Sequence, residues 1–369
     1  MKDEMKFWTP DRLIKTGAQY RIAFGPRTGG KTFGVLKHSF ARYLEDGSEL
    51  AIIRRYDEDF VGANSAKFIY NGLMHDAFGV NQISEMSDGL YYGVEYYARN
   101  YYLTQVNSEG EIVRTNKIIA RAFALTGTEH TKGSTGFPMV KNILFDEFMA
   151  TTGYLNDEFT LFLHTLASII RQRDDVAVWM MGNAITRFCP YFAEMGLKNA
   201  KSMKQGDLEV YKFGESKLRV AIECVGADVS KRPSAVYFAF DNPKLAMITQ
   251  AGMWQLDIYP HLPMKYKPKD VVMEFFVIFD GETLHAEVIE SDSGVFIYMH
   301  RKTTPLRDPD NDLIYSLDHY DVRPNWNRSI RQYRTKTQKR IYQLVITGKI
   351  YFQDNEVGDM FHHYMEKCS

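Results

Sequence analysis

Short apolar runs alternate with segments of helical periodicity over the first two hundred or so residues. Apolar runs of strand length cover residues 20–24, 50–55, 118–125, 140–148, 176–183 and 218–224. After the first run, apolar side chains recur at spacings of three and four, which predicts an amphipathic helix that starts near Gly30. A second helical pattern lies around residues 159–171. This alternating order predicts an α/β fold with a mainly parallel sheet.

The pattern changes after residue 225. Residues 226–269 are rich in Pro, Gly and Lys and show weak periodicity, which predicts a linker or lid. Strand patterns follow at residues 271–280, 283–290 and 294–300, the first two as a hairpin around Gly281. The next helix is expected to carry Ile330 and Tyr333 on its apolar face, together with Ile341 and Leu344. We therefore expect three parts, at residues 1–225, 226–269 and 270–369, of which the last is a small α+β domain.

Composition narrows the class of protein. A length of 369 residues suits two domains, each with its own core. The formal net charge is −1, so any contact with nucleic acid must come from a local patch. The three cysteines form no C-x-x-C pair, which predicts neither a disulfide framework nor a cysteine zinc cluster and fits a reducing cytoplasm. We expect no contact with membranes, because no run of about 18 apolar residues and no signal-peptide pattern occurs.

The most specific motif is the segment Gly25-Pro26-Arg27-Thr28-Gly29-Gly30-Lys31-Thr32, which fits the G-x-x-x-x-G-K-[ST] phosphate-binding loop. A strand pattern precedes it and a helical pattern follows, as such a loop requires. Its glycines free the backbone for turns whose N–H groups face phosphate oxygens. Lys31 is expected to reach the β- and γ-phosphates of ATP and Thr32 to hold Mg²⁺. The loop alone does not separate kinases, GTPases and motors, and a Gly-rich turn that ends in Lys-Thr is the alternative.

Two adjacent carboxylates close the apolar strand at residues 140–148. Asp146 is expected to hold Mg²⁺ through its water shell, and Glu147 to polarise a water for in-line attack on the γ-phosphate. This pair favours hydrolysis over transfer to a second substrate. It also predicts the class of ATPases that carries an additional strand between the two motifs. A solvated acidic pair at a strand end is the alternative.

Four further polar residues are candidates for contacting the phosphates or stabilising their charge. Asn183 ends the strand after the acidic strand and is a candidate sensor of the γ-phosphate, or else a buried amide that satisfies backbone groups. Arg27 lies inside the loop and is a candidate for stabilising transition-state charge in cis. Arg171, and with less support Arg173, follows a helix and is a candidate for projecting into a neighbouring subunit. An exposed arginine in a salt bridge is the alternative for each.

Candidate nucleic-acid contacts are less specific. Arg54 and Arg55 end a strand and are interpreted as DNA contacts or inter-subunit switches, or else as solvated charge. Lys132 lies in the loop at residues 128–136 and is expected to touch phosphate if this loop reaches a central pore. Basic residues outnumber acidic ones between Arg323 and Arg340, which fits either a nucleic-acid track or a solvated helix face.

A set of motifs in a fixed order resembles the DNA-packaging ATPases of phi29-like bacteriophages, which are terminase-like P-loop ATPases of the additional-strand class. The set comprises the phosphate loop, Ile53-Arg54-Arg55-Tyr56, Phe145-Asp146-Glu147-Phe148, Arg171-x-Arg173 and Gly182-Asn183-Ala184. The resemblance is strong over about two hundred residues and weak beyond them. It departs at Asp57, where the relatives have a lysine, so a trans role for that position is in doubt.

The resemblance implies a homo-oligomeric ring, a pentamer, that hydrolyses ATP and drives double-stranded DNA into a procapsid. It implies that the ring docks on the portal (connector) protein and works in the host cytoplasm, transiently attached to the portal vertex. Arg171 matches the family's trans-acting arginine. A structural packaging RNA is a partner in some relatives, and its use here stays open.

For residues 270–369, the resemblance implies an RNase H-like vestigial nuclease domain. A two-metal nuclease needs three or four converging carboxylates. The hairpin offers Asp280 at its turn and scattered Glu274, Glu287 and Glu290. We therefore expect no nuclease activity. Two alternatives stay open, namely a terminase-type enzyme with an active nuclease and a non-hydrolysing, nucleotide-gated portal adaptor.

Overall fold

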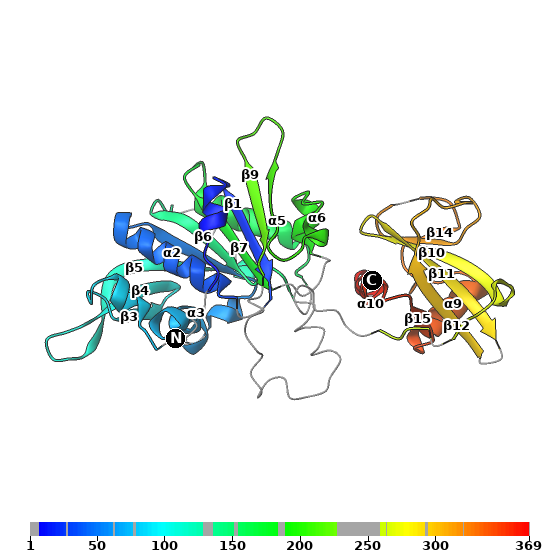
Figure 1. Ribbon diagram of the computed structural model, residues 1–369, viewed down its shortest axis with the longest axis horizontal. Coiled ribbons are helices and arrows are strands. Elements are labelled where there is room, and N and C mark those ends of the chain that lie inside the picture. Colours follow the sequence, from blue (N-terminus) through cyan, green and yellow to red (C-terminus); the bar gives the residue numbers. More distant parts are fainter. Residues whose placement is uncertain are drawn as a thin grey trace. The chain divides into compact units, whose positions relative to one another are not determined.

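The computed structural model describes residues 7–26, 29–61, 63–76, 79–127, 136–150, 154–183, 189–226, 259–262, 264–291, 294–319 and 321–368. Described residues up to 226 belong to one compact unit and those from 259 onward to another, each with its own sheet (Figure 1). The boundaries predicted above stay predictions, because most of the expected linker lies outside the described residues. Among the helices that are described, none is both long and apolar enough to cross a membrane.

The first unit is built on a sheet of nine strands in the order β3-β4-β5-β2-β6-β7-β1-β9-β8. The strands are β1 (Tyr20–Gly25), β2 (Glu49–Arg54), β3 (Gly93–Tyr97), β4 (Asn100–Val106), β5 (Ile112–Ala124), β6 (Val140–Asp146), β7 (Ala177–Asn183), β8 (Leu208–Lys212) and β9 (Arg219–Cys224). The central strands from β5 to β9 run parallel, and antiparallel pairs close both edges. The predicted α/β fold with a mainly parallel sheet is confirmed.

Strand β7 provides the additional strand. It follows β6 in the sequence but lies between β6 and β1, parallel to both. Close packing of Phe148 against β7 requires a glycine at position 182, since a Cβ at Gly182 would lie 2.8 Å from the ring of Phe148. The strand that precedes the phosphate loop and the strand that ends in Asp146 are thus one strand apart, as the additional-strand class predicts.

Helices cover both faces of this sheet. They are α1 (Asp11–Lys15), α2 (Lys31–Asp46), α3 (Ala63–Met74), α4 (Gln82–Met86), α5 (Glu158–Ile170) and α6 (Pro190–Glu194). On one face, Leu36 and Phe40 of α2 join the core that includes Trp179. On the other face, Phe145 of β6 stacks on Phe162 of α5 at 5.1 Å between ring centroids and contacts Tyr191 of α6 at 5.6 Å. These aromatic contacts fix the end of β6, where the acidic pair begins.

The second unit has a six-stranded sheet in the order β14-β13-β10-β11-β12-β15. Its elements are β10 (Val271–Phe279), β11 (Glu282–Ser291), β12 (Gly294–Arg301), β13 (Ile314–Ser316), β14 (Trp326–Asn327), α9 (Lys336–Ile346), β15 (Ile350–Phe352) and α10 (Asn355–Lys367). Strands β10 to β12 are antiparallel, β13 runs parallel to β10, and β14 and β15 run parallel to their neighbours. This is the α+β arrangement expected of an RNase H-like domain.

The first helix of this unit differs from the prediction. Helix α9 begins at Lys336, so Ile330 and Tyr333 precede it. Thr335 caps the helix by accepting a hydrogen bond from the Gln338 N–H, and this capping sets the start. Ile330 is buried instead as part of a turn whose N–H donates to the Tyr364 hydroxyl at 3.1 Å. Apolar spacing alone did not distinguish this buried turn from a helix.

Candidate nucleotide site

The phosphate loop begins where β1 meets its neighbour β9. Gly25 has φ +155°, and a Cβ there would lie 2.5 Å from the carbonyl oxygen of Val225. The Val225 N–H in turn donates to the Phe24 carbonyl at 2.8 Å. The first glycine of the motif is therefore required both by its backbone conformation and by a neighbouring chain segment.

The N-terminal segment braces the same loop, a feature that the motif does not reveal. The Trp8 N–H donates to the Gly29 carbonyl at 3.0 Å, and the Trp8 indole donates to Glu223 Oε2 at 3.0 Å. Glu223 is buried on β9 and also pairs with Arg12 at 2.5 Å. A lone tryptophan and a glutamate that lie 215 positions apart give no sequence signal, so sequence reasoning missed them.

Lys31 opens α2 and points back into the loop. Its ammonium donates to the carbonyls of Gly25 at 3.2 Å and Pro26 at 2.7 Å, and the side chain is buried. Burial lowers the pKa of Lys31 to about 8, although the carboxylate of Asp146 acts in the opposite direction. The loop therefore holds a desolvated cation where a phosphate would bind.

The predicted magnesium ligands are brought together. The Thr32 hydroxyl donates a hydrogen bond of 2.7 Å to Asp146 Oδ1, and Asp146 is buried at the tip of β6. A hydroxyl and a carboxylate oxygen are the hard donors that Mg²⁺ prefers. These residues fit Mg²⁺ and would hold it beside the phosphate loop, where it would supply positive charge.

Glu147 adopts the left-handed conformation, with φ +58°. A non-glycine residue there is strained, and such strain concentrates at functional sites. The next residue holds the turn in place, since the Phe148 N–H donates to the Met181 carbonyl at 3.3 Å. The Glu147 side chain remains 62% exposed, which suits a group that must act on a water.

These side chains line a cavity of about 350 Å³. Its polar residues are Lys31, Thr32, Arg54, Asp146, Glu147 and Asn183. Asn183 ends β7 in register with Gly25 of β1, which places the predicted sensor beside the loop. The cavity lies where parallel strands end, the usual position of ligand sites in α/β sheets.

Arg54 belongs to this cavity. Its guanidinium donates to Asp146 Oδ2 at 2.5 Å and lies 3.4 Å from Glu147 Oε2. Burial by itself would lower the pKa of Arg54, but the two carboxylates raise it above its usual value. Arg54 therefore pairs with the catalytic candidates, a position that suits a switch better than a DNA contact.

Arg55 forms a buried network. It pairs with Glu158 through two bonds of 2.7 and 2.8 Å and donates to the Phe148 carbonyl at 2.9 Å. Glu158 also accepts from the Tyr191 hydroxyl at 2.8 Å. A DNA contact by Arg55 would require this pair to break. Glu158 ties the turn after Asp146 to α5, and no motif had singled it out.

The two arginines after α5 differ. Arg173 donates to the backbone carbonyls of Ile169 in α5 at 3.2 Å and of Val140 in β6 at 2.8 Å, and so ties the helix end to the sheet. Arg171 is exposed, has φ +55°, and makes no side-chain hydrogen bond or ion pair with the described residues. Arg171 comes before β7, whose 7 residues span ~20 Å. Because Asn183 ends this strand, Arg171 lies near the opposite ends of the parallel strands. This position is remote from the chain's own cavity.

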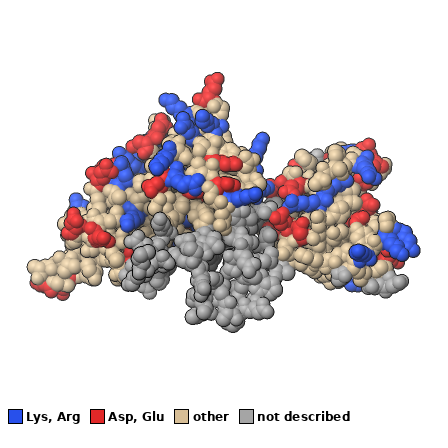
Figure 2. Space-filling view, viewed as in Figure 1, with Lys and Arg blue, Asp and Glu red and all other residues tan. Residues whose placement is uncertain are grey.

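The other predicted residues cannot be placed. Arg27 and Thr28 of the loop and Lys132 lie outside the described residues. Over the face in view, basic and acidic side chains are interspersed on both units (Figure 2). The described part of the chain thus assembles Lys31, Thr32, Asp146, Glu147 and Asn183 at one cavity and leaves Arg171 elsewhere.

The fold and this cavity define a P-loop nucleotide-binding protein of the additional-strand class. Residues 98–369 match the family described as Podovirus DNA encapsidation protein (Gp16). The chain belongs to this family of phage DNA encapsidation proteins, as the resemblance predicted.

Individual relatives agree with this assignment. The DNA packaging protein of Bacillus phage PZA is 19% identical over 362 residues, covering 96% of this chain and 95% of that protein. The DNA packaging protein of Bacillus phage B103 is 25% identical over 181 residues, so the match spans about half of either chain, at 48% and 47%. A chain in the solved bacteriophage Phi-29 viral genome packaging motor assembly shares the fold, with a TM-score of 0.54 at 18% identity over 98% of this chain and 99% of that one.

Proposed function

We propose that this chain is the ATP-hydrolysing subunit of a ring motor that translocates double-stranded viral DNA through the portal into a procapsid. The observation that carries the proposal is the meeting of Lys31, the Thr32–Asp146 pair and Glu147 at one cavity. A nucleotide-gated adaptor would need the first two features but not an exposed carboxylate beside them. Membership in the encapsidation family supports the role in packaging.

The chemistry follows from the positions of the groups. The phosphates bind along the loop and accept hydrogen bonds from its N–H groups, and Lys31 turns from the loop carbonyls to the β- and γ-phosphates. Mg²⁺, held near Thr32 and Asp146, would neutralise charge on the phosphate oxygens. Glu147 accepts a hydrogen bond from the attacking water and orients it in line with the γ-phosphate. Asn183 contacts the γ-phosphate, and Arg27 stabilises charge in cis.

Arg54 gives the site a second state. Its guanidinium is bonded to the Asp146 carboxylate, the group that would hold Mg²⁺. We expect nucleotide binding to release Arg54 from Asp146, which leaves the guanidinium available to a phosphate or to a neighbouring subunit. This supports the interpretation of Arg54 as a switch.

Arg171 completes the site of a neighbour in this proposal. Its exposure and its place at the end of β7 opposite Asn183 disfavour action in cis, so in the proposed ring Arg171 would serve the site of the next subunit. A guanidinium supplied in trans accelerates phosphoryl transfer by on the order of 10³-fold or more. The ring is a pentamer by resemblance, docked on the portal in the host cytoplasm, with Lys132 on the DNA, and the use of a packaging RNA stays open.

The nuclease alternative finds little support in the second unit. Where β10 lies beside β13, the paired positions are Phe276 with Ile314, Val277 with Tyr315 and Ile278 with Ser316. None of these positions carries a carboxylate. Glu290 pairs with Arg340 and Glu287 accepts from Tyr266, so these two acids of the hairpin engage different partners.

A packaging assay tests the proposal. Purified protein is mixed with procapsids, genomic DNA and ATP, and DNA protected from added nuclease is measured. We expect ATP-dependent protection and, by electron microscopy, a ring at the portal vertex. ATP hydrolysis without protection or a portal-bound ring would indicate a free helicase-like ATPase instead. Plasmid cleavage that is lost in Asp280→Ala would favour the nuclease alternative.

A further inference from the structure

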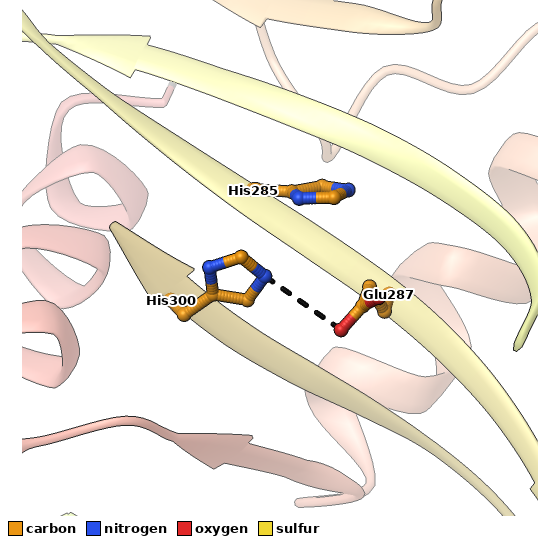
Figure 3. A group of neighbouring side chains, drawn as sticks. All are labelled: His285, Glu287 and His300. Atoms are coloured by element: carbon orange, nitrogen blue, oxygen red, sulfur yellow. Dashed lines mark ion pairs between the residues drawn. The ribbon is translucent and has the colours of Figure 1, made fainter. Parts of the chain in front are cut away.

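Two histidines and a glutamate gather on the sheet of the second unit. His285 and Glu287 lie two positions apart on β11 and share one face, and His300 of β12 is paired in register with His285 (Figure 3). One potential ligand atom from each residue lies within 4.8 Å of the other two. The imidazole centroids are 4.7 Å apart. This is the only such group of three among the residues that the structure describes.

The hydrogen-bonding role of His300 can be assigned. Its Nδ1 lies 3.1 Å from the carbonyl oxygen of Arg301, which can only accept, so Nδ1 carries the hydrogen. In the neutral ring, Nε2 then presents a lone pair, and this atom lies 3.6 Å from Glu287 Oε2. Two acceptors that face each other repel unless a proton or a metal cation lies between them.

His285 has the complementary arrangement. Its Nε2 lies 3.0 Å from Glu274 Oε2, so Nε2 donates to this carboxylate and Nδ1 keeps the lone pair. A ring nitrogen that keeps its lone pair is the donor that binds a metal ion.

Glu287 is held from outside the cluster as well. The Tyr266 hydroxyl donates to Glu287 Oε2, which orients the carboxylate. Ligands of bound metals characteristically have such outer partners: a carboxylate or backbone carbonyl for each histidine and a hydrogen bond to each acid. Here all three residues have one, from Glu274, the Arg301 carbonyl and Tyr266.

We propose that His285 Nδ1, His300 Nε2 and Glu287 bind a divalent transition metal ion of the zinc type. Two imidazoles and one carboxylate with a fourth position left to water match a known zinc ligand set. Nitrogen donors disfavour Mg²⁺ and Ca²⁺. Zinc–ligand bonds of about 2.0–2.2 Å bring tetrahedral ligands to roughly 3.4 Å from one another, so side-chain rotations must close the gap.

The surrounding charge is compatible with a cation. The ionisable groups facing the cluster are Glu274 of β10, Glu287 itself, Tyr266, Tyr298 and Lys302. The Lys302 ammonium donates to Thr304 and lies 5.8 Å from the ring of Phe276, which in turn stacks on His285. Glu274 and Glu287 carry two negative charges and Lys302 one positive charge, so the site has a net negative charge.

This site is independent of nucleotide chemistry. Its ligands come from β11 and β12 of the second unit, whereas the nucleotide cavity is lined by residues of the first unit. A metal ion here would link β11 to β12 and leave one coordination position for water or for a ligand from a partner. Its binding can be measured without ATP or DNA.

Titration calorimetry of the metal-free, full-length protein with Zn²⁺ tests the proposal. We expect one Zn²⁺ per chain in the wild type. His300→Ala and Glu287→Gln should each weaken binding at least tenfold, and Glu274→Gln, which removes only an outer partner, by about tenfold.

Controls separate this site from general histidine binding. His362→Ala removes an exposed histidine of α10 and should leave Zn²⁺ affinity unchanged. Circular dichroism checks that each variant folds, and the ligand-field spectrum of Co²⁺ bound to the wild type reports nitrogen ligation without any substitution. Absence of Zn²⁺ binding, or unchanged binding in the folded double variant His285→Ala/His300→Ala, would overturn the proposal.

Discussion

The Thr32 hydroxyl donates a 2.7 Å hydrogen bond to Asp146 Oδ1, joining two motifs that lie 114 positions apart. Strand β7 lies between β1 and β6, the strands that lead into these two motifs. The phosphate loop and the acidic pair thus form one site rather than two independent features.

Substitution of the first loop glycine should abolish nucleotide binding. In Gly25→Ala, the new Cβ meets the Val225 carbonyl at 2.5 Å in a conformation that favours glycine, so the loop must shift. The strain should cost more than ~1 kcal/mol of the free energy of unfolding. A fluorescent ATP analogue measures binding, with Gly29→Ala as the matched control, because its nearest neighbour would be 3.7 Å away. Equal binding by both variants would contradict this account of the loop.

ATP binding should take up a proton at alkaline pH. With a pKa of about 8, Lys31 is mostly protonated at pH 7 and mostly neutral at pH 9. Bound phosphates favour the ammonium and raise this pKa, so at pH 9 binding draws in close to one proton, and at pH 7 close to none. Calorimetry in buffers of different ionisation enthalpy measures the uptake. A pH-independent result would show that Lys31 does not meet the phosphates.

The Arg55–Glu158 pair should contribute strongly to folding. Glu158→Ala leaves a buried guanidinium without its partner, which costs about 3–5 kcal/mol of the free energy of unfolding. The exposed pair of Arg42 with Glu45, at 3.0 Å, provides the comparison, and Glu45→Ala should cost less than about 1 kcal/mol. Urea unfolding measures both values. A small effect of Glu158→Ala would mean that this network does not hold the acidic turn.

Arg171 should act on a neighbouring subunit. Arg171→Ala and Glu147→Gln should each be inactive alone, and a mixture should regain ATPase activity, because some interfaces then combine an intact Glu147 with an intact Arg171. Arg173→Ala is the control: it removes bonds that tie the end of α5 to β6 and should lower stability without complementation. If the mixture stays inactive although mixed rings form, action in trans is refuted.

The local chemistry of the site could be predicted because each motif is a short run with its own physical reason. The sequence from Gly25 to Thr32 places a loop, and the apolar run before Asp146 places a strand end. Partners brought together only by the fold gave no such signal. Glu158 and Glu223 look like ordinary surface acids in the sequence, yet both are buried and paired.

The same limit explains the helix that starts later than predicted. Ile330 and Tyr333 continue an apolar spacing, but the capping by Thr335 determines where α9 begins. Similarly, Arg54 and Arg55 are adjacent in sequence and point to different partners, Asp146 and Glu158. Strand alternation places them on opposite faces, and only the packed sheet shows what each one meets.

The central claim is that Glu147 serves hydrolysis in a site that binds ATP without it. The most direct measurement is ATP binding and Mg²⁺-dependent turnover by the wild type and Glu147→Gln, side by side. We predict equal ATP affinity and a turnover reduced by about 10²-fold or more in the variant. Retained turnover in Glu147→Gln, or a wild type that binds ATP without hydrolysing it, would contradict the account.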